Sequence, residues 1–82
     1  MSKLGKLIAK LKSNKHSLKW IELVTLLKAL GYVQIEGDGS RAKFDNGNAN
    51  DLINLHKPHP NKEIKAYALR QVLTKLTHAG LI

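Results

Sequence analysis

Apolar residues in the first third of the chain recur at the spacing of a helix. Near the amino end they are Leu4, Leu7, Ile8 and Leu11. Residues at such spacings share one side of a helix, so this stretch is predicted to be a short amphipathic helix with lysines on its other sides. A second helix is expected from Ser17, its predicted N-cap, to about Leu30, and Gly31 is expected to end it.

The second helix carries a continuous apolar stripe. Its members are Trp20, Leu23, Val24, Leu27 and Leu30, with Ile21 and Leu26 beside them. Glu22 and Lys28 fall on the opposite, solvent-facing side. A tryptophan within such a stripe is typical of a protein core, so Trp20 is expected to pack rather than to bind a ligand. The helix is therefore predicted to be scaffold.

The apolar period changes to two after Gly31, which indicates half-buried strands. Three strands are predicted, and each is expected to turn its more apolar side toward the helices. The inward residues are then Val33, Ile35, Ala42, Phe44, Ile53 and Leu55. The residues expected on the open sheet face are Tyr32, Gln34, Arg41, Lys43, Asn54 and His56. The alternation thus predicts one polar and basic sheet face.

Turn-forming residues separate these elements. Residues 37–40 join the first two strands, and the asparagine-rich residues 46–50 lead to the third. Pro58 and Pro60 interrupt the pattern, so residues 57–62 are predicted to form a loop. A last helix is expected from Glu63 or Ile64 to Ala79.

The predicted order is helix, helix, three antiparallel strands, helix. All connections are short enough for a two-layer α+β domain with the helices on one face of the sheet. A chain of 82 residues has room for one such domain only.

The composition narrows the classes of protein that fit. The chain has no cysteine, which excludes disulfides and thiolate metal sites and suits a reducing cytosol. Lys3, Lys6 and Lys10 interrupt the apolar residues near the amino end, so this segment is predicted to be neither a signal peptide nor a membrane span. A cytoplasmic location is expected.

The charge points to a polyanionic partner. Lysine and arginine number 14 and aspartate and glutamate 6, a formal net charge of +8, and nucleic acid is the commonest partner of so basic a domain. Six lysines precede Glu22, the first acidic residue. The basic first helix either binds nucleic acid or anionic lipid or simply docks its leucines on the domain, and the second interpretation is preferred.

The four histidines differ in their surroundings. His56 and His59 lie three positions apart, but no aspartate, glutamate or cysteine supports them in that loop, so no metal site is predicted. His16 and His78 lie beside helix ends and are interpreted as structural. The chain also lacks paired carboxylates, a nucleophile elbow and a phosphate-binding glycine loop.

Three stretches together resemble the HicA toxin family, small endoribonucleases of bacterial toxin–antitoxin systems. They are Trp20 to Gly31, Gly39-Ser40-Arg41 before a strand, and His56-Lys57-Pro58-His59-Pro60 before Lys62, Glu63, Tyr67 and Ala68. The resemblance implies a fold similar to the double-stranded-RNA-binding domain over residues 17–82, with residues 1–16 as an added basic helix. It also implies mRNA as the substrate, growth inhibition as the outcome and a HicB-like antitoxin as the partner.

One position departs from the family. Many members have Gly-Ser-His where this chain has Gly39-Ser40-Arg41, and that histidine is their presumed catalytic residue. Arginine does not exchange protons near neutral pH, but it binds phosphate in a bidentate manner and stabilises developing negative charge.

A metal-independent mRNA interferase needs proton-transfer groups and positive charge around the scissile phosphate. His56 is the first choice for proton transfer and His59 the second, with Arg41 as the charge-stabilising residue. The residues expected to bind RNA are Ser40, Arg41, Lys43, Lys57 and Lys62. No cofactor is expected. The alternative is a noncatalytic RNA-binding module of the same fold, in which the same cations hold phosphates without cleavage.

Overall fold

A computed structural model of the protein describes residues 3–13, 18–37, 39–58 and 63–82. The helices are α1 (Lys3–Lys12), α2 (Trp20–Ala29) and α3 (Ala66–His78), and the strands are β1 (Val33–Glu36), β2 (Arg41–Asp45) and β3 (Ile53–His56). A single 3₁₀ turn, η1 (Ala49–Asp51), precedes β3. The strands form one antiparallel sheet in the order β1-β2-β3, so the predicted α+β fold with a three-stranded antiparallel sheet is confirmed.

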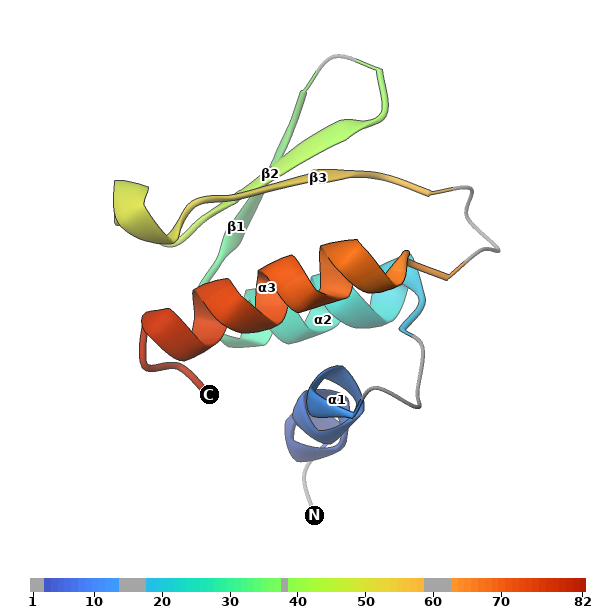
Figure 1. The fold of residues 1–82 in the computed structure, drawn as a ribbon. Helices are drawn as coiled ribbons and strands as arrows, with labels where there is room; N and C mark the ends of the chain where they lie inside the picture. Colours follow the sequence, from blue (N-terminus) through green and yellow to red (C-terminus); the bar gives the residue numbers. More distant parts are fainter. Residues whose placement is uncertain (1–2, 14–17, 38, 59–62) are drawn as a thin grey trace.

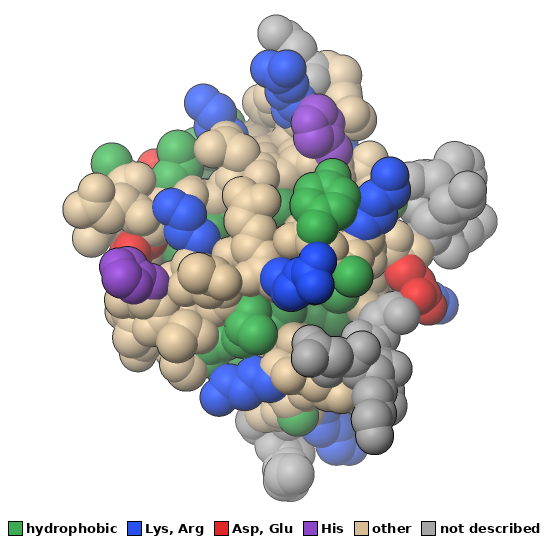
Figure 2. All heavy atoms as spheres, viewed as in Figure 1, with side chains coloured by type: hydrophobic (Ala, Val, Ile, Leu, Met, Phe, Trp, Pro, Cys, Tyr) green, Lys and Arg blue, Asp and Glu red, His purple; other side chains and the backbone are tan. Residues whose placement is uncertain are grey.

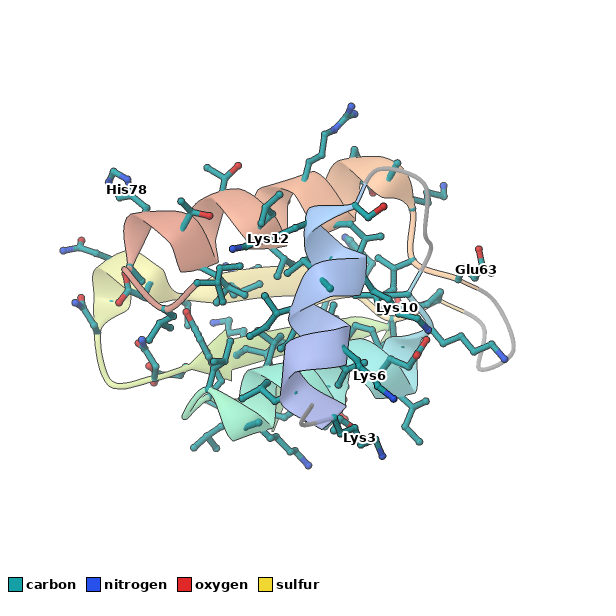
Figure 3. The ribbon with its side chains drawn as sticks, turned by 90° about the horizontal axis from the view of Figure 1, so that it is seen from below. Lys3, Lys6, Lys10, Lys12, Glu63 and His78 are labelled. Carbon is teal, nitrogen blue, oxygen red and sulfur yellow. The ribbon has the colours of Figure 1, made fainter. Side chains whose placement is uncertain are left out.

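The elements stack in layers (Figure 1). The helices α2 and α3 lie side by side against one face of the sheet, and α1 packs across their other side, away from the sheet (Figure 3). The core between these layers includes Phe44 from the sheet, Leu27 from α2 and Val72 from α3, all fully buried. The second sheet face carries no helix among the described residues, and β2 and β3 present polar side chains there.

Helix α1 belongs to this core. Its predicted apolar stripe is confirmed, because Leu7 and Leu11 are buried with the residues of α2 and α3. The Lys10 Nζ atom also donates a hydrogen bond to a Glu22 carboxylate oxygen at 2.8 Å, which ties α1 to the start of α2. The amphipathic first helix is thus docked by its leucines, as the sequence interpretation preferred.

Helix α2 begins later than expected. Lys19 is its N-cap, and the Lys19 backbone N–H donates to the Glu22 carboxylate at 3.1 Å; the predicted cap, Ser17, lies outside the described residues. Trp20 is partly buried and its ring lies against Phe44, with centroids 5.8 Å apart, in agreement with a packing role. Ile21 does not join the stripe, since 72% of it is exposed. Gly31, at a φ of 97°, ends the helix as predicted.

The predicted orientation of the first strand is wrong. Val33 and Ile35 are 63% and 45% exposed, whereas Tyr32 is only 3% exposed. In the antiparallel register Gln34 lies opposite buried Phe44 and therefore shares its face, which is the helix side. Tyr32 and Gln34 are accordingly not on the open sheet face; Val33 and Ile35 are.

Tyr32 explains this inversion physically. It follows the end of α2 directly, and its ring enters the core there while its hydroxyl donates a hydrogen bond to the Asp51 carbonyl at 2.9 Å. This arrangement buries the large ring and still satisfies its polar end. The strand that follows must then place every second residue, beginning with Val33, on the open face.

The other two strands follow the predicted alternation. Ala42 and Phe44 of β2 and Ile53 and Leu55 of β3 are buried. Their neighbours along the strands point to the open face, as expected.

Helix α3 also starts later than the sequence pattern indicates. Glu63 forms an antiparallel bridge with Lys19, and the Ile64 N–H donates to the Leu18 carbonyl at 2.9 Å. These contacts hold residues 63 and 64 in an extended conformation, so the helix begins at Ala66. Ile64 is nevertheless buried, and Ile82 packs partly against the core beyond Gly80.

No helix in the described parts of the chain has the length and apolar character needed to cross a membrane.

Candidate functional site

The open sheet face brings a histidine and an arginine into direct opposition. Arg41 is the first residue of β2 and His56 the last of β3, and the register pairs them across the two strands. Both are exposed. Directly opposed residues in an antiparallel pair have their Cβ atoms about 5 Å apart. The two side chains are therefore close enough to contact the same group of a ligand. The expected shared face of Arg41, Lys43 and His56 is what the register shows.

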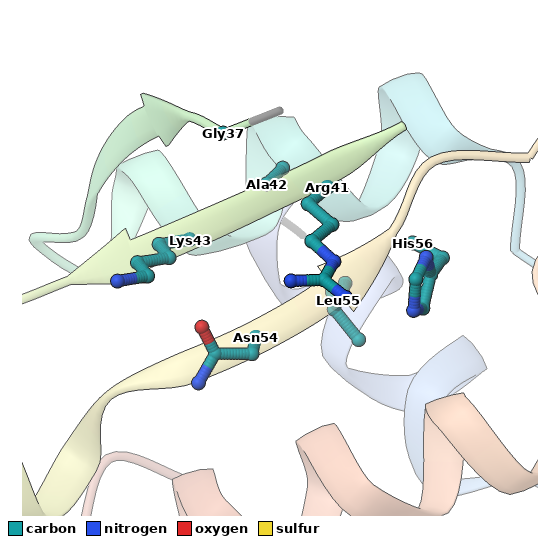
Figure 4. Close-up of a pocket in the computed structure, with 7 residues that line it drawn as sticks. All are labelled: Gly37, Arg41, Ala42, Lys43, Asn54, Leu55 and His56. Carbon is teal, nitrogen blue, oxygen red and sulfur yellow. The ribbon is translucent and has the colours of Figure 1, made fainter. Parts of the chain in front are cut away.

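A second row of polar residues lies beside this pair. Lys43 is opposite Asn54 on one side and Ile35 on the other. Figure 4 shows the Arg41 guanidinium reaching toward β3, between the side chains of Asn54 and His56. Two cations, an amide and an imidazole thus surround one region of the sheet.

These residues line a pocket of about 430 Å³. The lining residues are Gly37, Arg41, Ala42, Lys43, Asn54, Leu55 and His56. Its charge is positive, with arginine and lysine on β2 and no carboxylate among the lining residues. A pocket of this composition fits the phosphate and sugar groups of a nucleic acid strand.

Gly37 is a site residue that the sequence interpretation treated only as part of a turn. Its N–H donates to the Arg41 carbonyl at 2.9 Å, and a Cβ at this position would lie 3.2 Å from the Arg41 Cβ. Any larger residue would crowd the arginine. The signal in the sequence was Gly37 itself, a second glycine two residues before Gly39.

Of the residues predicted to bind RNA, Arg41 and Lys43 line the pocket, whereas Ser40 and Lys57 do not. Ser40 is exposed beside Arg41, and its carbonyl accepts a hydrogen bond from the Lys57 N–H at 2.6 Å. The Lys57 side chain does not line the pocket; its Nζ pairs with a Glu36 carboxylate oxygen at 2.6 Å. Part of its charge is therefore neutralised within the protein. His59 and Lys62 lie outside the described residues.

The lysines of α1 form a separate basic region. Lys3, Lys6, Lys10 and Lys12 are carried by the helix that packs on the far side of α2 and α3, away from the sheet (Figure 3). Lys10 is engaged with Glu22, and the pKa of the Glu22 carboxyl is lowered by that hydrogen bond and by the one from the Lys19 backbone. The pocket on the sheet therefore does not depend on α1 for its charge.

The described side chains do not form a cluster of the kind that binds a metal ion. Among them no group of three histidine, aspartate or glutamate residues is arranged to hold a metal ion. His78 is exposed at the end of α3 and is absent from the pocket lining. His16, like His59, lies outside the described residues.

The fold and this pocket define a small basic α+β domain with a cationic, histidine-bearing sheet face. The chain matches the family model described as the HicA toxin of bacterial toxin–antitoxin systems over residues 20–81, and it belongs to that family. Membership gives it a toxin role and implies an antitoxin as partner. The chain matches none of the curated proteins and none of the solved structures with which it was compared. The matched range excludes α1, which ends at Lys12.

Proposed function

We propose that the protein is a metal-independent endoribonuclease that cleaves mRNA on its open sheet face and thereby inhibits translation and growth. The observation that carries this proposal is the cross-strand pair Arg41 and His56, exposed together in one positively charged pocket. A phosphate-binding cation and a proton-transfer group at adjacent positions are what RNA cleavage without metal requires.

The reaction is an attack of the ribose 2′-oxygen on the adjacent phosphorus. The bond from phosphorus to the 5′-oxygen breaks, which leaves a 2′,3′-cyclic phosphate and a free 5′-hydroxyl. One group must accept the proton of the 2′-hydroxyl and another must protonate the departing 5′-oxygen. His56 transfers the proton at one of these positions, because imidazole changes charge near neutral pH, and His59 is the candidate for the other.

Arg41 supplies charge rather than proton transfer. A guanidinium is positively charged and forms paired hydrogen bonds to phosphate oxygens. Because negative charge increases on these oxygens as the phosphorane forms, an arginine placed there stabilises the transition state more than the ground state. Lys43 adds a second cation, while Ser40 lies beside the pocket and holds the strand end through its carbonyl.

The antitoxin proposed here is HicB-like and acidic where it contacts the toxin. Arg41 and Lys43 present exposed positive charge on the open sheet face, and an acidic surface would complement it and block RNA at the same time. Lys57 and Lys62, which are also expected to bind RNA, are further candidates for this contact, and the pairing of Lys57 with Glu36 reduces the positive charge that Lys57 offers. We propose a cytoplasmic location for toxin and antitoxin, because the proposed substrate, mRNA, is found there.

A noncatalytic RNA-binding module is the second candidate. Arg41 occupies the position where many family members have a histidine, and His56 is the only histidine lining the pocket among the described residues. Such a module would hold RNA by the same cations and would not cut it.

Cleavage of a purified mRNA by the purified protein in EDTA separates these possibilities. The proposal expects cleavage that EDTA does not reduce, with products ending in a 2′,3′-cyclic phosphate. Binding without cleavage would favour the noncatalytic module. Loss of cleavage in EDTA that zinc or manganese restores would show a metal site instead.

A further inference from the structure

A second groove runs beside the first pocket, between the edge of β3 and the start of α3. It has a volume of about 400 Å³. Its lining residues are Asn54, Leu55, His56, Lys57, Pro58, Ile64, Lys65, Tyr67, Ala68 and Gln71. In Figure 2, apolar, basic and histidine side chains gather on the face that carries these two elements.

His56 lies on the boundary of the two hollows. It lines both the pocket of the open sheet face and this groove, as do its neighbours Asn54 and Leu55. The two hollows therefore adjoin along β3. A nucleotide next to a phosphate bound at Arg41 and His56 would lie at this groove.

Tyr67 gives the groove the chemistry of a base-binding site. It is in the first turn of α3 and is 59% exposed, a large fraction for an aromatic residue that lines a groove. Gln71 follows one helical turn later on the same side of α3. An exposed aromatic ring is the usual platform for an unpaired base, and an amide beside it can hydrogen-bond the edge of that base.

We propose that this groove, the Tyr67 groove, binds the nucleotide adjacent to the cleaved bond, with its base stacked on Tyr67 and its edge facing Gln71. The inference rests on the proposed RNA cleavage at Arg41 and His56. Lys65, exposed at the N-cap of α3, neutralises the phosphate that enters or leaves the groove. Single-stranded RNA is chosen over a protein segment because the groove is continuous with the phosphate-binding pocket and has a lysine at its margin.

The test measures binding of a short 2′-O-methyl oligoribonucleotide to the full protein. This probe has no 2′-hydroxyl proton and is not cut, so binding is separated from catalysis and His56 is left intact. Tyr67→Ala should weaken binding by about 5- to 150-fold, the range that stacking of one base provides. Tyr67→Phe should bind like the wild type, and Ile21→Ala, at an exposed apolar residue of α2 outside both hollows, is the matched control.

An abasic scan of the same probe identifies the stacked base. At one position the abasic probe should bind wild type and Tyr67→Ala equally, because the base that the ring contacts is gone. Lys65→Gln should lower the dependence of binding on salt concentration by about 0.7 in the log–log slope, as for one lost phosphate contact on a single strand.

Three outcomes overturn the inference. Equal binding of wild type and Tyr67→Ala to every probe, while the wild type binds and cleaves RNA, removes the groove and leaves the proposed function intact. Loss of antitoxin binding alone in Tyr67→Ala assigns the groove to the protein partner. No binding of any RNA by the wild type removes the proposed function and this inference together.

Discussion

Arg41 and His56 are directly opposed on neighbouring strands, at the end of the sheet where Gly37 leaves the arginine uncrowded. This places a guanidinium next to an imidazole on the one sheet face that no described helix covers. Arg41 stands at the position where many family members carry a histidine, and the histidine of this pair is on the neighbouring strand instead. In the proposed function, phosphate binding and proton transfer therefore belong to different strands.

Replacing Arg41 tests the phosphate-binding half of this pair. Arg41→Ala should weaken RNA binding and cleavage together and should reduce the salt dependence of binding, because one phosphate contact is lost. Filter binding or fluorescence anisotropy at several salt concentrations measures this. Arg70→Ala, at an exposed arginine of α3 outside the pocket, should behave like the wild type. An Arg41→Ala variant with wild-type binding at every salt concentration would remove Arg41 from the site.

Substitution of Tyr32 tests the observed orientation of β1, which depends on the burial of this residue. Tyr32→Phe removes the hydroxyl that donates to the Asp51 carbonyl, and it should lower the free energy of unfolding by about 0.5–1.5 kcal/mol. Tyr67→Phe, at an exposed tyrosine, should change it by less than about 0.5 kcal/mol. Urea denaturation of both variants at neutral pH gives the comparison. Equal effects at the two positions would contradict the buried placement of Tyr32.

The same residue gives a prediction at alkaline pH. Burial, and then the nearby Asp51 carboxylate, raise the pKa of the Tyr32 phenol above its usual value of 10.0. The folded state therefore holds this proton more tightly than the unfolded state. The contribution is fully present below pH 10 and is lost as the pH rises through the raised pKa. The stability difference between wild type and Tyr32→Phe should accordingly shrink above pH 10, and a difference that stays constant would argue against the shift.

The ion pair between Lys10 and Glu22 should contribute in a pH-dependent way. Glu22→Gln should cost about 0.3–1 kcal/mol at pH 7, the range of partly exposed pairs, and less in a Lys10→Met background, where the carboxylate keeps only its contact with Lys19. Because the pKa of Glu22 is lowered in the folded state, its contribution is present above about pH 4.5 and is lost as the pH falls through the lowered pKa. Denaturation curves at pH 7 and at acid pH check this; a cost that persists in acid would contradict it.

Leu11 tests whether α1 is part of the domain or an appended element. The residue is buried in the common core, so Leu11→Ala should lower the free energy of unfolding of the whole protein by about 2–5 kcal/mol. Lys12→Ala, at the next and exposed position, is the matched control. Thermal unfolding followed by circular dichroism would show the loss as one cooperative transition. A separate early transition of α1 alone would indicate that residues 1–16 are an independent addition.

Local patterns were sufficient for most of the fold. The stripe of α2 and the alternation in β2 and β3 each repeat over enough residues for one face to be clearly more apolar, and the structure buries those faces. The shared face of Arg41 and His56 could be predicted for the same reason, because both strands place their small or apolar residues at every second position. Their direct opposition depends on the register, which the connection through residues 46–52 does not determine by itself.

Two features depended on contacts that a local pattern does not contain. In the stretch from Tyr32 to Glu36 both sides carry an apolar or aromatic residue, and Tyr32, which enters the core at the end of α2, decides which side is buried. At the start of α3, Glu63 fits a helical spacing but bridges to Lys19 instead. Each outcome was decided by a partner far away in the sequence. The groove at Tyr67 has the same origin, since β3 and α3 meet only in the folded chain.

Cleavage of mRNA by His56→Ala is the most direct test of the central claim. The account predicts a loss of about 100-fold or more in cleavage rate, the contribution of a general acid or base, with a change in unfolding free energy within about 1 kcal/mol because the residue is exposed. His78→Ala, at an exposed histidine on α3, should cleave like the wild type. Cleavage by His56→Ala at the wild-type rate would contradict the assignment of proton transfer to this residue.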